Sequence, residues 1–258
     1  KRLADVRYMI TLDADTLLPP GSALRLICTL AHPLNRAEVN SDTGRVLAGY
    51  TVLQPRIETL SNRKSNSLFA KLFAGDCAID IYSRAVSDVY QDLFGVGSYV
   101  GKGIHDVRTF QDSLSHRVPE NAILSHDLFE GIHGRVGLAT DIILYEDFPN
   151  SWAEYAAKQH RWIRGDWQLL PWLGRSVPVA PGIRERSVFN MLDRWKLLDN
   201  LRRSMIPLAL CLFFVAGWLW LPGDSTVWTI FAVGSFAPYL LDEAFSGLAT
   251  LSRRLRPQ

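Results

Sequence analysis

The chain has 258 residues, of which 48% are hydrophobic and 21% are charged, so it is not intrinsically disordered and can bury a sizeable core. Its 28 basic and 26 acidic residues give a formal net charge of +2, which gives no reason to expect a nucleic-acid partner. The three cysteines, Cys28, Cys77 and Cys211, lie too far apart in sequence for a Cys-x-x-Cys site or a disulfide framework, and we expect reduced structural thiols. With no initiator methionine and no signal peptide, the sequence is expected to be a piece of a longer protein.

Residues 1–185 have the composition of a globular domain. Apolar segments of strand length predict strands at Val6–Leu12, Ala48–Leu53 and Leu138–Leu144. Between the second and third of these, Leu60–Phe94 is predicted to form one or two helices, because its apolar residues recur at helical spacing. Strands separated by helices favour an α/β fold with a parallel or mixed sheet.

Residues 186–258 have a different composition. Ser187–Ser204 is predicted to form an amphipathic helix in a membrane interface, because basic residues flank an apolar stripe made of Val188, Met191, Leu192, Trp195, Leu198 and Leu201. Met205–Leu221 follows without a charge and is long enough to cross a bilayer, and Val227–Leu241 is a second apolar stretch. Basic residues on both flanks predict a transmembrane helical hairpin with the globular part in the cytosol. The alternative is a buried helical hairpin of a soluble protein.

Two carboxylates follow the first predicted strand. Asp13 and Asp15 stand two positions apart, so in an extended chain their side chains point the same way. Hard oxygen ligands of this kind suit Mg²⁺ or Mn²⁺ beside a phosphate, and ligands bind beyond the carboxyl ends of strands in open α/β sheets. The alternative is a solvated acidic loop.

A second acidic group precedes a predicted helix at Ser125–Gly131. In the functional interpretation, Asp127 is a general base that takes a proton from an attacking hydroxyl. In the structural interpretation, Ser125 or Asp127 caps the helix.

Two further segments carry possible chemistry. Lys158–Trp167 is cationic and rich in aromatic residues, so it could form a belt at a membrane interface. Alternatively, Arg161 could bind a diphosphate and Trp162 could stack on a sugar ring. Phe94–Ile104 holds several glycines at a spacing that is neither the Walker nor the Rossmann fingerprint, and it is predicted to be a flexible loop facing the substrate.

The order of these motifs, with the apolar helices after them, resembles that of the processive, membrane-bound family 2-like glycosyltransferases. That family carries an Asp-x-Asp, a Thr-Glu-Asp-type base motif and a Gln-x-x-Arg-Trp motif ahead of transmembrane helices. Here Asp127 matches the base, while Ser125 and His126 depart from the residues before it. Lys158 stands where Gln is usual, followed by Gln159 and the matching Arg161 and Trp162.

A closer resemblance, from about Asp13 to Trp172, is to the glycosyltransferase domain of cyclic β-1,2-glucan synthases (glycosyltransferase family 84). It rests on three segments, Tyr99–Val107, Ser125–Gly131 and Gln159–Trp167. The resemblance implies the C-terminal part of a GT-A (Rossmann-like) glycosyltransferase domain, with the N-terminal nucleotide-binding part missing. It is followed by an interfacial helix and a transmembrane helical hairpin.

The same resemblance implies the reaction and its setting. The donor would be UDP-glucose, the acceptor a growing β-1,2-glucan, and the cofactor Mg²⁺ or Mn²⁺. The location would be the bacterial inner membrane, with the catalytic part facing the cytosol. The full-length protein would carry further membrane segments and a phosphorylase-like region.

Roles follow for the matching residues. Asp13 and Asp15 would hold the metal on the diphosphate, supported by Arg161 and Gln159. Asp127 would deprotonate the acceptor 2-hydroxyl in one inverting displacement. Contacts to the sugar or the acceptor are expected from Trp162, Lys102 and Asp106.

Three alternatives stay open at this point. The chain could belong to another processive synthase, of the cellulose, chitin or hyaluronan type, which the product linkage would reveal. It could be a glycosidase with Asp13 and Asp127 as its two carboxylates, which would release no UDP. It could also be a non-catalytic, membrane-anchored glycan-binding module.

Overall fold

The computed structural model describes residues 5–40, 43–60, 67, 69–70, 88–124 and 127–235. The chain divides into two compact units, Lys1–Leu198 and Asp199–Gln258. The division lies after the boundary predicted near residue 185, because Phe189 and Leu197 are buried in the same apolar cluster as Phe129 and Trp172.

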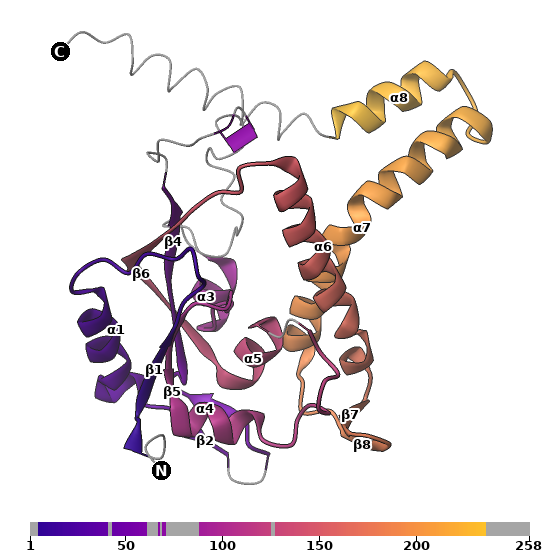
Figure 1. The fold of residues 1–258 in the computed structure, drawn as a ribbon. Helices are drawn as coiled ribbons and strands as arrows, with labels where there is room; N and C mark the ends of the chain where they lie inside the picture. Colours follow the sequence, from indigo (N-terminus) through magenta and orange to yellow (C-terminus); the bar gives the residue numbers. More distant parts are fainter. Residues whose placement is uncertain are drawn as a thin grey trace, which may run out of the picture. The chain divides into compact units, whose positions relative to one another are not determined.

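A four-stranded mixed sheet forms the centre of the first unit (Figure 1). Its order is β1 (Tyr8–Thr11), β5 (Gly103–Asp106), β4 (Val52–Thr59) and β6 (Val136–Glu146). Strand β5 is antiparallel to both of its neighbours, while β4 and β6 are parallel. The prediction of an α/β fold with a mixed sheet is therefore confirmed.

Two of the three predicted strands are confirmed and one is wrong. Strands β1 and β6 cover the segments expected at 6–12 and 138–144. The segment at 48–53 is not one strand, because Gly49 adopts a left-handed φ of 66° and the chain turns there. Strand β3 (Val46–Ala48) ends before this turn and pairs with β2 (Glu38–Val39), and β4 starts after it.

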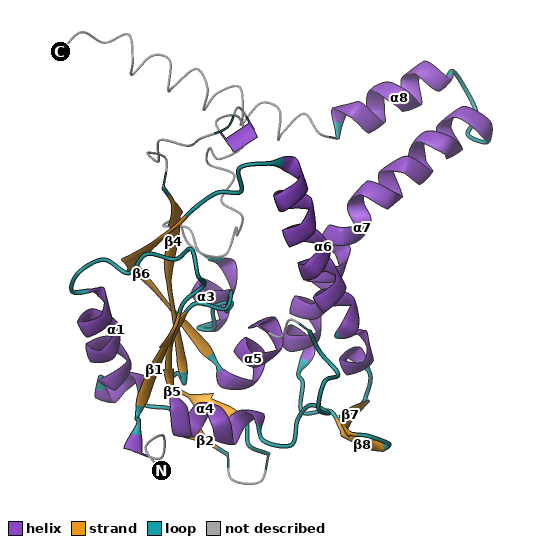
Figure 2. Ribbon diagram, in the orientation of Figure 1, coloured by secondary structure: helices purple, strands orange, loops and turns teal. Residues whose placement is uncertain are grey.

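Helices cover both faces of the central sheet (Figure 2). Helix α1 (Ser22–Ala31) buries Leu26 and Leu30 against one face. On the other face Phe110 of α4 (Val107–Leu114) packs against a cluster of Val52, Tyr99 and Val136. Helix α5 (Asp127–Gly134) begins at Asp127, so the helix predicted after the acidic group is confirmed.

The remaining elements of the first unit connect these layers. They are η2 (Pro33–Asn35), α3 (Val89–Phe94), α6 (Trp152–Gln168), η4 (Leu170–Leu173), and an antiparallel pair made of β7 (Ser176–Ala180) and β8 (Ile183–Arg186).

Most of the helical region predicted at 60–94 lies outside the described residues, as do Ser125, His126 and Cys77. Cys28 and Cys211 are free and exposed.

A single helix replaces the first two helical segments predicted after residue 186, the interfacial helix at 187–204 and the apolar stretch at 205–221. Helix α7 runs unbroken over Met191–Leu219, whereas residues 187–190 are not helical. The expected apolar stripe is packed only in part, because Leu201 is buried whereas Met191, Trp195 and Leu198 are exposed. Asp193, Lys196 and Leu197 are buried instead, which is possible because the two charged side chains find partners inside the first unit.

The second unit holds the apolar turns of α7 and the helix α8 (Ser225–Gly234). Trp218 Nε1 donates to Thr229 Oγ1 at 2.9 Å, and the rings of Phe213 and Trp228 lie 6.0 Å apart, so the two helices pack together. Within the described residues, α7 is the one helix long and apolar enough to cross a membrane. The end of the second predicted stretch, 236–241, lies outside the described residues, and the transmembrane hairpin stays a prediction.

Candidate active site

The strand directions bring four polar residues to one edge of the central sheet. Strands β1, β4 and β6 run the same way, so their carboxyl ends share an edge with the amino end of the antiparallel β5. Asp13 and Asp15 follow β1, Lys102 precedes β5, and Glu146 ends β6. This edge is where open α/β sheets bind ligands.

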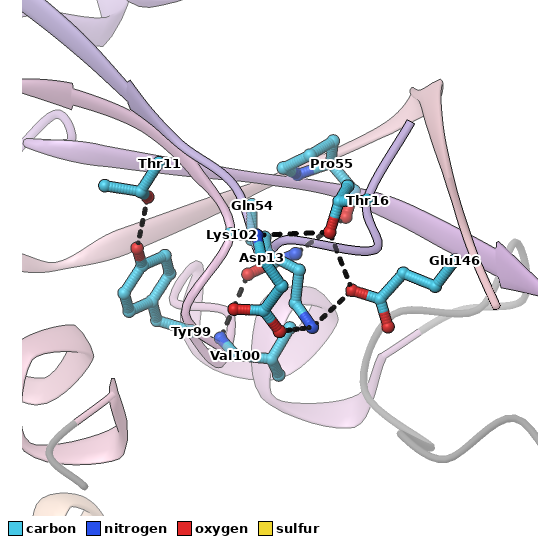
Figure 3. A network of polar contacts seen from close by, with 9 residues as sticks. All are labelled: Thr11, Asp13, Thr16, Gln54, Pro55, Tyr99, Val100, Lys102 and Glu146. Atoms are coloured by element: carbon cyan, nitrogen blue, oxygen red, sulfur yellow. Dashed lines mark hydrogen bonds and ion pairs between the residues drawn. The ribbon is translucent and has the colours of Figure 1, made fainter. Parts of the chain in front are cut away.

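The loop that carries Asp13 and Asp15 is fastened to the end of β6. Leu17 and Tyr145 exchange backbone hydrogen bonds of 2.7 and 3.1 Å. The hydroxyl of Thr16 donates to Glu146 Oε1 at 3.1 Å and accepts from the backbone N–H of Asp13 at 3.2 Å (Figure 3). The acidic loop is thus held across the sheet edge against Glu146.

Three carboxylates converge as a result. Asp13, Asp15 and Glu146 each offer an oxygen, and these atoms lie within 4.8 Å of one another. Asp13 and Asp15 are exposed, whereas Glu146 is buried. An all-oxygen set of this kind fits Mg²⁺ or Mn²⁺, which take carboxylate ligands. We refer to these three residues as the carboxylate cluster.

Asp13 and Asp15 were predicted from the sequence as metal ligands, whereas Glu146 was not. Glu146 lies two residues after the strand predicted at 138–144. An acid at the end of a strand that runs parallel to β1 was the available signal, because such ends meet at one edge.

Lys102 contacts two members of the carboxylate cluster, Asp13 and Glu146. Its ammonium nitrogen is 3.0 Å from Asp13 Oδ2 and 2.5 Å from Glu146 Oε1, and the residue is 6% exposed. Burial acts to lower the pKa of Lys102, but the carboxylates of Glu146 and Asp13 outweigh it and the pKa is raised. Lys102 is therefore a permanent cation at this edge.

A loop of residues 95–101, which we call the glycine loop, leads to Lys102 and lies against Asp127 at Gly101. The buried side chain of Gln54 accepts from the Val100 N–H at 3.0 Å and so holds the end of the loop. Gly101 has a φ of 86°, and a Cβ there would lie 2.8 Å from Asp127 Oδ2. Only glycine fits between the backbone and this carboxylate.

The half-buried Thr11 and the buried side chains of Tyr99 and His105 join the glycine loop to β1 and β5. The Tyr99 hydroxyl lies 2.8 Å from Thr11 Oγ1 and 2.9 Å from His105 Nε2. Burial lowers the pKa of His105 to about 4, so its imidazole is neutral at pH 7. Burial likewise raises the pKa of the Tyr99 phenol. The sequence analysis assigned no role to these neutral hydrogen-bonding groups.

Helix α6 positions the Arg-Trp residues. Gln159 and Trp162 are half-buried and Arg161 is exposed. Lys158 Nζ lies 5.2 Å from the centre of the Trp162 ring, one helical turn away. In the described part of the chain no hydrogen bond or ion pair joins Arg161 to the carboxylate cluster, and its contact with a diphosphate stays a prediction.

Asp106 occupies a structural position at the far end of β5 from Lys102. Its carboxylate accepts from the Thr109 N–H at 3.3 Å as the N-cap of α4. It also lies 3.7 Å from Arg7 Nε. The capping role accounts for an aspartate at this position without any bound ligand. The predicted contact of Asp106 with the acceptor stays a prediction.

The comparisons with known proteins agree with the motifs. No protein-family model matches the chain. Over 232 residues, or 89% of its length, the chain is 43% identical to a protein named cyclic beta-(1,2)-glucan synthase NdvB, from Rhizobium meliloti (strain 1021). The chain spans 8% of the length of that relative. The resemblance to the glycosyltransferase region of a cyclic glucan synthase is therefore confirmed.

Proposed function

We propose that this chain is part of a membrane-bound glycosyltransferase that moves glucose from UDP-glucose to a growing β-1,2-glucan. Two observations carry the proposal: the carboxylate cluster with Lys102 at one edge of the sheet, and the carboxylate of Asp127 against Gly101, the residue before Lys102. The identity to a region of a named glucan synthase supports the choice of reaction. The GT-A fold, the donor and the inverting course are parts of the proposal.

The carboxylate cluster would hold Mg²⁺ or Mn²⁺. Such an ion supplies positive charge to a departing diphosphate. Lys102 already neutralises part of the negative charge of Asp13 and Glu146, so the edge can accept an anionic nucleotide without an excess of carboxylate charge. Arg161 and Gln159 would bind the diphosphate from α6, and Trp162 would pack against the sugar.

Asp127 would serve as the general base. Its carboxylate takes the proton of the acceptor 2-hydroxyl while that oxygen forms a bond to the anomeric carbon. The bond from the anomeric carbon to the diphosphate breaks in the same step, and UDP leaves with the bonding electrons. One displacement from the opposite face converts an α-linked donor into a β-linked product.

The apolar stretch Met205–Leu221, which α7 covers up to Leu219, would form a membrane-crossing segment in the bacterial inner membrane, with the catalytic unit in the cytosol. The partners would be the lipid bilayer, the glucan acceptor and the remaining domains of the same polypeptide. No nucleic acid is expected among them.

The test uses the full-length protein in membranes with radiolabelled UDP-glucose and Mg²⁺ or Mn²⁺, with and without a chelator. We expect metal-dependent incorporation into a polymer whose linkage analysis shows β-1,2 bonds. Another linkage would identify a different synthase with the same mechanism. Hydrolysis of a glycan without UDP release would indicate a glycosidase, and glycan binding without transfer would indicate a binding module.

Asp15→Asn and Asp141→Asn form a matched pair for this assay. Asp15 belongs to the carboxylate cluster, whereas Asp141 is an exposed residue of β6 that pairs with Arg25 at 2.6 Å. We expect Asp15→Asn to lose metal-dependent transfer and Asp141→Asn to keep it. Equal activity of the two variants would contradict the proposed metal site.

A further inference from the structure

The first turns of α7 bury a lysine that the proposed chemistry does not use. Lys196 is 6% exposed, and its ammonium donates to the backbone oxygens of Gly97 at 2.8 Å and Val96 at 3.3 Å. The same nitrogen lies 4.8 Å from the centre of the Tyr90 ring. Lys196 thus contacts the beginning of the glycine loop and the helix α3 that precedes it.

The charge of Lys196 has no carboxylate in direct contact within the described residues. Asp193 is engaged by Arg45 at 2.8 Å and by the N–H of Asn190 at 2.8 Å. Asp88 caps α3 by accepting from the Gln91 N–H at 2.9 Å. Burying a cation is costly, so the partners of Lys196 are carbonyl dipoles and an aromatic face that hold it in one place.

The other contacts of the glycine loop show what Lys196 adds. The Gly97 N–H donates to the Val136 oxygen at 2.8 Å, and the Val100 N–H donates to Gln54. These two bonds use N–H groups of the loop, and Lys196 donates to the carbonyl oxygens of Val96 and Gly97. The loop is therefore held both through its N–H groups and through its carbonyl groups before it reaches Gly101, which lies against Asp127.

We propose that Lys196 is a positioning residue, which holds the carbonyls of Val96 and Gly97 and thereby sets the place of the glycine loop against Asp127. The proposal rests on the proposed function, since Asp127 is the base of that reaction. It makes the packing of residues 191–198, the part of α7 that belongs to the first unit, a condition for an ordered active site.

The chain offers a matched control on the same helix. Arg194 of α7 also donates to backbone oxygens, those of Leu173 and Gly174, but it does not contact the glycine loop. The variants Lys196→Met and Arg194→Met both remove a cation that binds carbonyls of the first unit. They differ in whether the glycine loop loses a contact.

Two measurements on the full-length protein in nanodiscs test the proposal. Amide hydrogen exchange, followed by mass spectrometry, reports on peptides that cover residues 95–101. Steady-state transfer from UDP-glucose reports on kcat and KM. In Lys196→Met we expect exchange in these peptides to be about tenfold faster, because the loop loses charge-assisted hydrogen bonds. We also expect kcat to fall about tenfold with KM for the donor nearly unchanged, and Lys196→Arg to recover part of both.

Arg194→Met should leave exchange in the glycine loop and kcat as they are in the unmodified protein. Unchanged loop exchange in Lys196→Met, or an equal increase in Arg194→Met, would overturn the proposal. Faster exchange without a fall in kcat would also overturn it. If the unmodified protein transfers no glucose, the proposed function fails, while the exchange data still decide whether Lys196 holds the loop. Lys196→Gln, which keeps one donor group, replaces Lys196→Met if the latter does not accumulate.

Discussion

Two buried lysines are held in opposite ways. Lys102, at the carboxylate cluster, contacts Glu146 and Asp13 at 2.5 and 3.0 Å, and its pKa is raised. Lys196, at the glycine loop, contacts carbonyl oxygens and an aromatic ring, and burial lowers its pKa to about 8 although Asp88 and Asp193 oppose the shift. Both residues are 6% exposed. Burial acts to lower the pKa of both lysines, and the partners decide whether the net shift is upward or downward.

The difference separates two tasks. At the carboxylate cluster the cation offsets negative charge, so its removal leaves the buried carboxylate of Glu146 without its cation. At the glycine loop the cation satisfies backbone acceptors, so its removal loosens the loop without leaving an opposite charge. Four predictions test this comparison.

The largest effect is expected from Asp127, the carboxylate against which the glycine loop lies at Gly101. Asp127→Asn should lower turnover about 10²- to 10⁴-fold, because a general base contributes a factor of this size. The amide occupies the same space beside Gly101, so the fold should be kept. Transfer from labelled UDP-glucose measures turnover, and Mn²⁺ binding by electron paramagnetic resonance checks that the carboxylate cluster is intact. Turnover within threefold of the unmodified protein would remove Asp127 as the base.

The next largest effect is expected from a substitution that breaks the ion pair between Lys102 and Glu146. Lys102→Met should destabilise the protein by about 3 to 5 kcal/mol, because Glu146, whose side chain is 7% exposed, loses its cation. The double variant Lys102→Met/Glu146→Gln should recover most of this loss. Urea unfolding followed by tryptophan fluorescence measures both. If the double variant is no more stable than Lys102→Met, the ion pair with Glu146 does not account for the stabilising effect of Lys102.

A third prediction concerns pH and separates the two lysines. Lys196 has a folded pKa of about 8, below its unfolded value of 10.5, so the unfolded chain binds more protons between these values. Its contribution to stability therefore rises with pH from about 8 to about 10.5, by about 3 kcal/mol in all. The free energy of unfolding of the unmodified protein minus that of Lys196→Met, measured against pH, should show this rise. A flat difference would contradict it, and Lys102, whose pKa is raised, should show no rise in this window.

The smallest effect comes from a third lysine. Lys158 also lies over an aromatic ring, that of Trp162 at 5.2 Å, but both residues are only half-buried. Lys158→Gln should change the free energy of unfolding by about 0.5 to 1 kcal/mol, the value for an exposed cation–π contact. The same urea experiment measures it. A loss as large as that of Lys102→Met would mean that burial does not set the scale of these contacts.

Several features of the molecule follow from neighbouring residues and are visible in the sequence. The apolar run before Asp13 predicted β1, the acidic group predicted a helix start that falls at Asp127, and the uncharged run after residue 204 predicted the apolar turns of α7. Side-chain periodicity and capping depend on residues within a few positions, so these signals are local. The motif order also predicted the resemblance to a glucan synthase region, which the identity of 43% confirms.

Other features depend on contacts between distant residues, and only the tertiary structure decided them. Thr16 and Glu146 are 130 positions apart, and Lys102 and Asp13 are 89 apart, so no local pattern places them together. Lys196 fell on the polar side of the predicted interfacial helix, yet it lies buried because the glycine loop presents two carbonyl oxygens there. A side chain's charge and hydropathy are set by its own atoms, whereas its burial and its partner are set by the strand order that folding selects.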